Sequence, residues 1–256
     1  MLKKILIPVV VFVGFTTMAF YKVKHLEEKT VISNAAIHPP IVVLELFTSQ
    51  GCSSCPPADV LLEKAKNQYP DQLFALSYHV DYWNYIGWED PFSNPNFSKK
   101  QREYNRKFRY PSNYTPEMVI NGKEHFVGSN SGKLRSKIDA YLDLKIENHL
   151  VLENVAKNGN TIAFNYALAG PLQGKQLRAI LVLDERTTVV KRGENRNRTL
   201  KNSNIVIAEQ YLTDTSASGN SVVQLPNGIG KNEKLHLIVL AENENLEITG
   251  AAKYSL

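Results

Sequence analysis

The alternation of apolar and polar positions divides the folded part of the chain into two halves. In the first half, residues 41–48 (IVVLELFT) form an apolar, β-branched run that is typical of a strand buried on both faces. A helical pattern extends from about residue 54 to residue 69, with Pro56 and Pro57 in its first turn, where amide protons lack a helical partner. Residues 73–80 (LFALSYHV) form a second apolar run. This order predicts two parallel strands joined by a helical crossover.

The first half continues with four further segments. Residues 81–95 form a loop rich in aromatic residues, and residues 96–109 are basic and helical in character. Residues 117–128 predict a hairpin that turns at Asn121-Gly122, a dipeptide that suits a tight turn. Residues 131–144 predict a helix that closes this half.

The pattern of apolar and polar residues changes at about residue 146, where short alternating segments begin that are separated by Gly, Asn and Ser clusters. These segments are residues 150–155, 161–168, 176–184, 204–211, 221–225, 234–242 and 246–254. Regular short strands with such breaks predict an antiparallel sandwich. The predicted fold class is therefore an α/β domain over residues 41–145, followed by an all-β sandwich-like domain over residues 146–256.

The N-terminus has the layout of an export signal. Lys3 and Lys4 precede an uncharged, largely apolar run over residues 5–21, and a polar linker over residues 22–40 follows. The run is also close to the shortest length that spans a bilayer. The sequence thus predicts either a cleaved signal peptide or an anchor that tethers the protein to a membrane through residues 5–21. In both cases we expect the folded part to be exported, either to the periplasm or out of the cell.

Composition and charge exclude several other classes. Hydrophobic residues make up 43% of the chain, which is typical of a globular protein and not of a disordered one. The 30 Lys and Arg residues are interspersed among 25 Asp and Glu residues, which gives a net charge of +5. Because no run of five like charges occurs, the sequence argues against a nucleic-acid partner.

The candidate chemistry lies in the only two cysteines, Cys52 and Cys55. A disulfide that closes so short a loop stabilises a fold only weakly, so we interpret this pair as chemical and not structural. The pair precedes a helix, whose positive end favours the reactive thiolate, and the spacing lets the second thiol resolve a mixed disulfide. We expect Cys52 to be the exposed nucleophile and Cys55 the resolving thiol. A four-sulfur zinc site is excluded because no second such pair exists.

Four segments carry a resemblance to a known family. They are residues 45–58 (ELFTSQGCSSCPPA), residues 79–88 (HVDYWNYIGW) with Asp90-Pro91, residues 114–122 (YTPEMVING), and residues 190–195 (VKRGEN) with 198–200 (RTL). On these motifs the chain resembles DUF1223, a family of secreted proteins of unknown function, and more broadly the thioredoxin-like superfamily. The resemblance implies a thioredoxin-like fold for residues 41–145, with an inserted aromatic loop and basic helix.

The resemblance also implies roles for individual residues. Thr115-Pro116 corresponds to a cis-proline segment that faces the cysteines, and Pro116 would orient the substrate chain. Glu45 is a candidate for a buried acid that assists proton transfer from the second cysteine. Its spacing from the cysteines differs from that of the thioredoxin acid, so a Glu held in an ion pair is an equal alternative.

Several polar and aromatic residues have two interpretations each. His79 and Asp81 follow a strand that ends at the same sheet edge as the cysteines, so His79 is a candidate general base or a third ligand for Cu(I) beside Cys52 and Cys55. The favoured alternative is a packed His79 with Asp81 capping the next turn. Trp83 and Trp88 suit either a substrate-binding rim or the packing of a lid.

The charged segment at residues 191–201 also has two interpretations. It suits an anion-binding patch or a solvated loop with internal ion pairs, and the solvated loop is favoured.

The leading functional hypothesis is an exported thiol–disulfide oxidoreductase that uses its own redox-active disulfide and no bound cofactor. Its partners would be exported proteins or small molecules with thiols or disulfides, and a redox partner that the sequence does not identify. One alternative is a copper carrier that binds Cu(I) through Cys52, Cys55 and His79. The other alternative is a binding module without catalytic activity.

Overall fold

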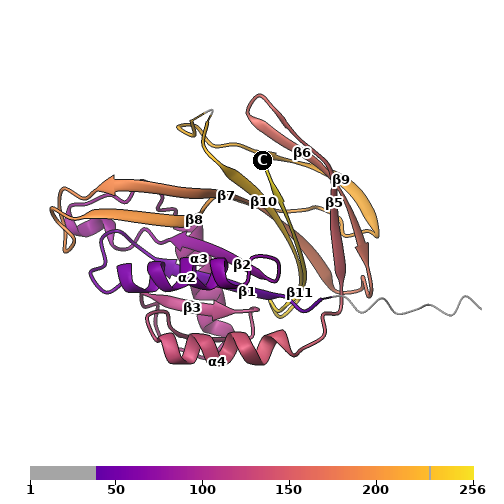
Figure 1. Ribbon diagram of the computed structural model, residues 1–256, viewed down its shortest axis with the longest axis horizontal. Coiled ribbons are helices and arrows are strands. Elements are labelled where there is room, and N and C mark those ends of the chain that lie inside the picture. Colours follow the sequence, from indigo (N-terminus) through magenta and orange to yellow (C-terminus); the bar gives the residue numbers. More distant parts are fainter. Residues whose placement is uncertain (1–38, 231) are drawn as a thin grey trace, which may run out of the picture. The chain divides into compact units, whose positions relative to one another are not determined.

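The computed structural model describes residues 39–230 and 232–256, which belong to one compact unit (Figure 1). The predictions made for residues 1–38, which include the signal segment and nearly all of the linker, lie outside the described residues. Within the described part of the chain, no helix is long and apolar enough to cross a membrane.

The described residues form many strands and few helices. The helices are α2 (Pro56–Gln68), α3 (Pro95–Lys107) and α4 (Ser131–Leu142), with a 3-10 turn η1 (Asn84–Ile86). The strands are β1 (Val42–Thr48), β2 (Leu73–His79), β3 (Glu117–Ile120), β4 (Glu124–Val127), β5 (His149–Asn158), β6 (Thr161–Ala169), β7 (Lys175–Val189), β8 (Thr199–Tyr211), β9 (Ser218–Gln224), β10 (Leu235–Asn243) and β11 (Ile248–Ser255). Each strand expected from the hydrophobic pattern is present, with bounds shifted by a few residues or, for β7 and β8, extended toward the turn between them.

One mixed sheet of eight strands dominates the fold, in the order β11-β10-β7-β8-β2-β1-β3-β4 (Figure 1). β1 and β2 run parallel, with partners from Val42↔Leu73 to Thr48↔His79, which confirms the crossover predicted from the sequence. β8 pairs in parallel with the other side of β2, at Ser77↔Ile205. The remaining strands, β5, β6 and β9, form a separate antiparallel sheet.

The expected fold class, an α/β thioredoxin-like domain followed by an all-β sandwich-like domain, is therefore wrong. Four strands of the second half, β7, β8, β10 and β11, extend the sheet that the first half begins. The physical reason is the free edge of β2, whose unpaired backbone groups need hydrogen-bond partners. β8 pairs with this edge at Ser77↔Ile205, so the two halves share a sheet instead of folding as separate layers. The hydrophobic pattern identified the strands but not the strand that each one would pair with.

The side chains of β1 alternate between two differently covered faces. Val42, Leu44 and Leu46 pack with α2 and α4, whereas Val43 and Phe47 pack with α3. The three-stranded sheet packs against β7 and β10 at the other end of the large sheet. These layers leave the carboxyl ends of β1 and β2 beside the start of α2, where the two cysteines lie.

A fully buried arginine joins the two halves on the α3 side of the sheet. Nη1 of Arg178, on β7, donates to Glu45 Oε1 of β1 at 2.8 Å and lies 3.1 Å from Glu209 Oε2 of β8. Its Nε lies 3.1 Å from Glu242 Oε2 of β10. Burial opposes the ionisation of Glu209, but Lys100 and Arg178 lower the pKa of this carboxyl to about 2. The cluster is thus a charged core that requires strands from both halves.

We expect Arg178→Met to destabilise the protein strongly, because it leaves the buried carboxylates of Glu45 and Glu242 without their cation, while Glu209 keeps only Lys100. A broken buried ion pair costs about 3–5 kcal/mol of unfolding free energy, measured here by urea denaturation. Arg186→Met is the matched control, since Arg186 lies on the same strand and pairs with Glu233 near the surface. The control should lose about 0–1 kcal/mol. Equal losses in both variants would contradict the central role of Arg178.

Candidate functional site

The two cysteines form a disulfide between the end of β1 and the start of α2, with Cα atoms 5.5 Å apart. Cys55 caps α2, and its carbonyl accepts hydrogen bonds from the N–H groups of Ala58 and Asp59 at 2.8 and 3.2 Å. Pro56 begins the helix, a position at which the missing amide proton costs nothing. The disulfide therefore lies at the positive end of the helix, where a thiolate is favoured.

Both cysteines are buried, with 0% of either residue exposed, whereas Ser53 and Ser54 between them are exposed. The expectation that Cys52 is exposed is therefore wrong. Two loops that lie far apart in the sequence cover the disulfide turn, which comprises residues 49–55 between β1 and α2. The sequence pattern did not reveal that these loops meet there. The loops are the aromatic loop, residues 81–94, and the cap loop, residues 190–198.

The aromatic loop packs directly on the residues that precede Cys52. A Cβ placed on Gly51 would lie 3.1 Å from Trp83 Cβ and 3.2 Å from the Ile86 side chain, so the aromatic loop packs closely against this backbone. Trp83 Nε1 donates to Thr115 Oγ1 at 2.7 Å. Trp88 Nε1 donates to the side-chain oxygen of Gln50 at 3.2 Å. Both tryptophans proposed as a substrate rim are thus half-buried neighbours of the disulfide turn.

Two side chains of the cap loop bind the backbone of the disulfide turn. Asn195, itself fully buried, donates from Nδ2 to the carbonyl oxygens of Gln50 and Cys52, each at 2.9 Å. Glu194 Oε2 accepts a hydrogen bond from the backbone N–H of Ser53 at 2.9 Å. Glu194 is exposed, as the favoured interpretation of a solvated loop expects, whereas Asn195 is fully buried and does not fit that interpretation. The signal that pointed to them is the motif VKRGEN among the segments that carry the family resemblance.

Thr115 and Pro116 lie on another side of the turn. The peptide bond between them is cis, which is the isomer that the resemblance implied. Ser54 Oγ donates to the Thr115 carbonyl at 3.5 Å, so this segment lies beside the residues between the two cysteines.

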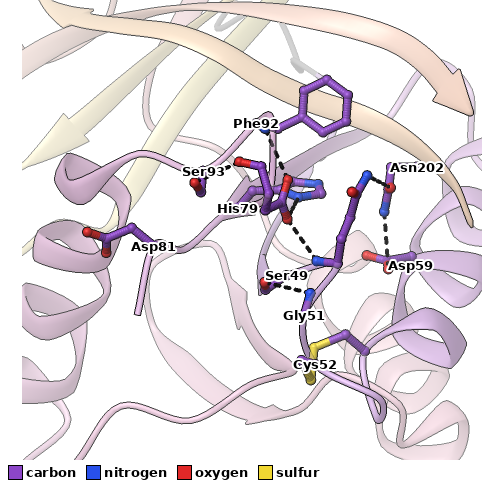
Figure 2. A network of polar contacts seen from close by, with 12 residues as sticks. Ser49, Gly51, Cys52, Asp59, His79, Asp81, Phe92, Ser93 and Asn202 are labelled. Carbon is purple, nitrogen blue, oxygen red and sulfur yellow. Dashed lines mark hydrogen bonds and ion pairs between the residues drawn. A yellow bond between two sulfur atoms is a disulfide. The ribbon is translucent and has the colours of Figure 1, made fainter. Parts of the chain in front are cut away.

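A buried ion pair contacts the backbone that precedes Cys52 (Figure 2). His79 Nδ1 lies 2.7 Å from Asp90 Oδ2, and the same oxygen accepts the N–H of Gln50 at 2.7 Å. Burial opposes the charge on His79, but Asp90 raises the pKa of the imidazole above its ordinary value. Asp81 points away from this network in Figure 2, and its carboxylate bonds to Ser98 of α3. His79 and Asp81 are therefore not brought together.

Asp59 is a buried acid of this site that the sequence interpretation missed. It lies four residues after Cys55 on α2, and this spacing places both side chains on the same helix face. Asn202 connects Asp59 to the turn, because its Nδ2 lies 3.5 Å from Asp59 Oδ2 and its Oδ1 accepts from Gln50 Nε2 at 2.9 Å (Figure 2). Burial raises the pKa of Asp59 to about 7, with His79 opposing and Asp90 adding to the rise. Asp59 thus resists ionisation up to about neutral pH.

Glu45 does not belong to this group of residues. It projects from β1 toward the α3 side and accepts hydrogen bonds from Arg178 and the Tyr104 hydroxyl, whereas Asp59 lies on the α2 side. The structure therefore places Glu45 in an ion pair, one of the two interpretations of this residue.

The proposed Cu(I) ligands are also not gathered into a site. Across residues 39–230 and 232–256, no group of three or more His, Cys, Asp or Glu side chains is arranged to hold a metal ion.

Comparisons with known proteins agree with the motifs. The model of a family described as "Protein of unknown function (DUF1223)" matches residues 43–242, a span that includes the disulfide turn and both covering loops. The crystal structure of protein AGR_C_4864 from Agrobacterium tumefaciens is similar over 84% of this chain and 95% of that one, with 27% identity and a TM-score of 0.61.

A β-glucosidase from Kluyveromyces marxianus matches 44% of this chain and 14% of its own, with 11% identity and a TM-score of 0.22. The search of curated proteins found no match.

We expect Asp59→Asn to stabilise the oxidised protein at about pH 8. An unfolded aspartate ionises near pH 3.8, whereas Asp59 in the folded protein keeps its proton up to about pH 7, so unfolding is favoured as the pH rises between these values. At about 1.4 kcal/mol per pKa unit, the gain in unfolding free energy is at most about 4 kcal/mol. It should shrink towards zero at about pH 4. Urea denaturation of both proteins across this range measures the difference.

Asp90→Asn is the matched control and should behave in the opposite way. Burial opposes ionisation of Asp90, but His79 and the N–H groups of Gln50 and Phe92 hold the pKa of this carboxyl below its ordinary value. Its contribution to stability is present above about pH 4 and disappears as the pH falls through the lower pKa of the folded protein. The variant should therefore lose stability at neutral pH. A gain there would show that the charge network is misassigned.

Proposed function

Since the chain belongs to the DUF1223 family, whose function is unknown, we propose a function from the geometry of its own site: reversible thiol–disulfide exchange by an exported protein. The observation that carries the proposal is the Cys52–Cys55 disulfide at the N-terminus of α2. A link of sequence separation 3 removes little entropy from the unfolded chain and contributes little to stability. A redox role therefore explains this disulfide better than a role in stabilising the fold does.

The exchange proceeds in two displacements. A substrate thiolate attacks Cys52 Sγ, the Cys52–Cys55 bond breaks, and Cys55 leaves with the electron pair as a thiolate that takes up a proton. The second thiolate of the substrate then attacks the substrate sulfur of the mixed disulfide and releases Cys52. In total, two electrons and two protons pass from a substrate dithiol to the protein, and the reverse reaction reduces a substrate disulfide.

Asp59 is suited to the proton transfer in this proposal. It shares a helix face with Cys55, and its pKa of about 7 lets it hold or release a proton near neutral pH. When Cys55 leaves, a protonated Asp59 supplies the proton. When Cys55 attacks the mixed disulfide in the reverse direction, an ionised Asp59 accepts it.

The substrate class follows from what surrounds the disulfide. An open groove of about 480 Å³ borders the start of α2 and is lined by Pro56, Pro57, Val60, Ser129 and Arg198, among others. This groove begins at Pro56, directly after Cys55, and its size suits an extended protein segment. Thr115 lies beside Ser54 and is hydrogen-bonded to Trp83, so this segment with Pro116 would border the same substrate. We therefore propose exported proteins as substrates, with a separate redox partner that restores the pair.

Export is part of the same proposal. A disulfide persists in the periplasm or outside the cell, whereas cytosolic thiols are kept reduced. The two lysines and the apolar run at residues 5–21 support this location.

The test is the reduction potential of Cys52–Cys55, measured by equilibrating metal-free protein with glutathione and reading the thiol state by mass spectrometry. We expect one two-electron transition between about −120 and −270 mV, the range of exchange catalysts. Failure of the pair to equilibrate with glutathione would overturn the proposal, and titration with Cu(I) would then test the carrier hypothesis.

A second experiment assigns the attacked sulfur. In Cys55→Ser the resolving thiol is gone, so a mixed disulfide with glutathione should accumulate on Cys52, in a stoichiometry close to one. Cys52→Ser should trap several-fold less. Equal trapping on both cysteines would contradict the assignment of Cys52 as the nucleophile.

A further inference from the structure

Glu194 touches the peptide that connects the two cysteines. Its Oε2 accepts the N–H of Ser53 at 2.9 Å, although Glu194 belongs to a loop 141 residues further along the chain. Hydrogen bonds from Ser53 hold the pKa of Glu194 below its ordinary value, so the side chain is an anion at neutral pH. A negative charge thus lies beside the residue that follows Cys52.

Neighbouring contacts anchor the backbone on both sides of this exposed carboxylate. The next residue, Asn195, is fully buried and bridges the carbonyls of Gln50 and Cys52. The preceding residue, Gly193, has a φ of +75° and lies so close to Ile86 that a Cβ there would come within 2.7 Å of it. The backbone on both sides of Glu194 is therefore anchored to the disulfide turn and to the aromatic loop.

Two opposing electrostatic effects meet at Cys52. The positive end of α2 favours a thiolate on this sulfur. The Glu194 carboxylate, bound to the N–H of the residue that follows Cys52, repels the same thiolate. The Ser54 hydroxyl, which lies 3.3 Å from Cys52 Sγ, is the polar group beside the sulfur itself. Other charges face the turn as well: Asp59, His79 and Asp90 lie beneath it, and Arg198 Nη1 donates to Asn195 Oδ1 at 2.8 Å. Within the described residues, no cation forms an ion pair with Glu194 that would cancel its charge.

We propose that Glu194 sets the reduction potential of the Cys52–Cys55 pair by acting on Cys52 through Ser53. Its charge disfavours the thiolate form of the dithiol and thereby stabilises the disulfide, so the pair is a weaker oxidant than the helix position alone would make it. This inference rests on the proposed function. It gives the cap loop a role in choosing which thiols the protein can oxidise and which disulfides it can reduce.

Three variants test it by equilibration with glutathione. Glu194→Gln keeps an acceptor for Ser53 but removes the charge, and Glu194→Ala removes both. Each should shift the equilibrium toward the dithiol by about threefold to tenfold, which corresponds to about 15–30 mV. The pKa of the Cys52 thiol, read from thiolate absorbance against pH in the reduced protein, should fall by about 0.5–1. Glu185→Gln, an exposed carboxylate on β7 paired with Lys201, is the control for charge and should change neither value.

The outcomes separate the inference from the function on which it rests. An unchanged potential in Glu194→Gln, with normal equilibration of the wild-type pair, overturns the inference and leaves the proposed function intact. A shift in Glu194→Ala without one in Glu194→Gln also overturns it, because the hydrogen bond and not the charge would then matter. A wild-type pair that does not equilibrate at all overturns the proposed function itself. Thermal unfolding of the oxidised variants confirms that each is folded before its potential is compared.

Discussion

The ion pair between Arg178 and Glu45 is the constraint on which the rest of the structure depends. The two residues are 133 positions apart, and both side chains are fully buried. Neither charge is tolerated in the core without the other, so β1 and β7 must belong to the same packed layer. Glu209 and Glu242 extend the requirement to β8 and β10. Once these strands share a sheet, the connection between β7 and β8 has a fixed position relative to the end of β1.

That connection is the cap loop, and the end of β1 is the disulfide turn. The charged core therefore determines, at a distance, that Glu194 and Asn195 meet the residues around Cys52. A second set of polar contacts holds Gln50, which lies two residues before Cys52. Asp90 holds the backbone of Gln50, and Asn202 of β8 holds its side chain. Gln50 thus receives contacts from three segments that are distant in sequence, which fixes the turn before any substrate is present.

The local parts of this structure were predictable from the sequence, and the pairings between distant parts were not. The run at residues 41–48, the prolines at the start of α2 and the spacing of the cysteines each determine local geometry, and the structure has the predicted strand and helix there. Arg178 lies in an apolar run whose alternation predicts a strand, but nothing in that run identifies Glu45 as the ion-pair partner of Arg178. The same holds for Asp59, which looks like an ordinary acidic residue in the first turn of a helix. Its raised pKa arises from burial by segments that the local pattern does not place.

The two loops that cover the cysteines differ in how firmly they are held, and this difference bears on access to the sulfurs. The aromatic loop contributes Phe92 to the hydrophobic core and Asp90 to the buried pair with His79, so displacing it breaks the core as well as the site. The cap loop is held mainly by hydrogen bonds of Glu194 and Asn195, and most of its residues are exposed. Segments with few apolar contacts open at a lower free energy than those packed in a core. In the proposed exchange, displacement of the cap loop from Cys52 and its neighbours would release Glu194 from Ser53, so a substrate that approaches from this side would also remove the charge beside Cys52.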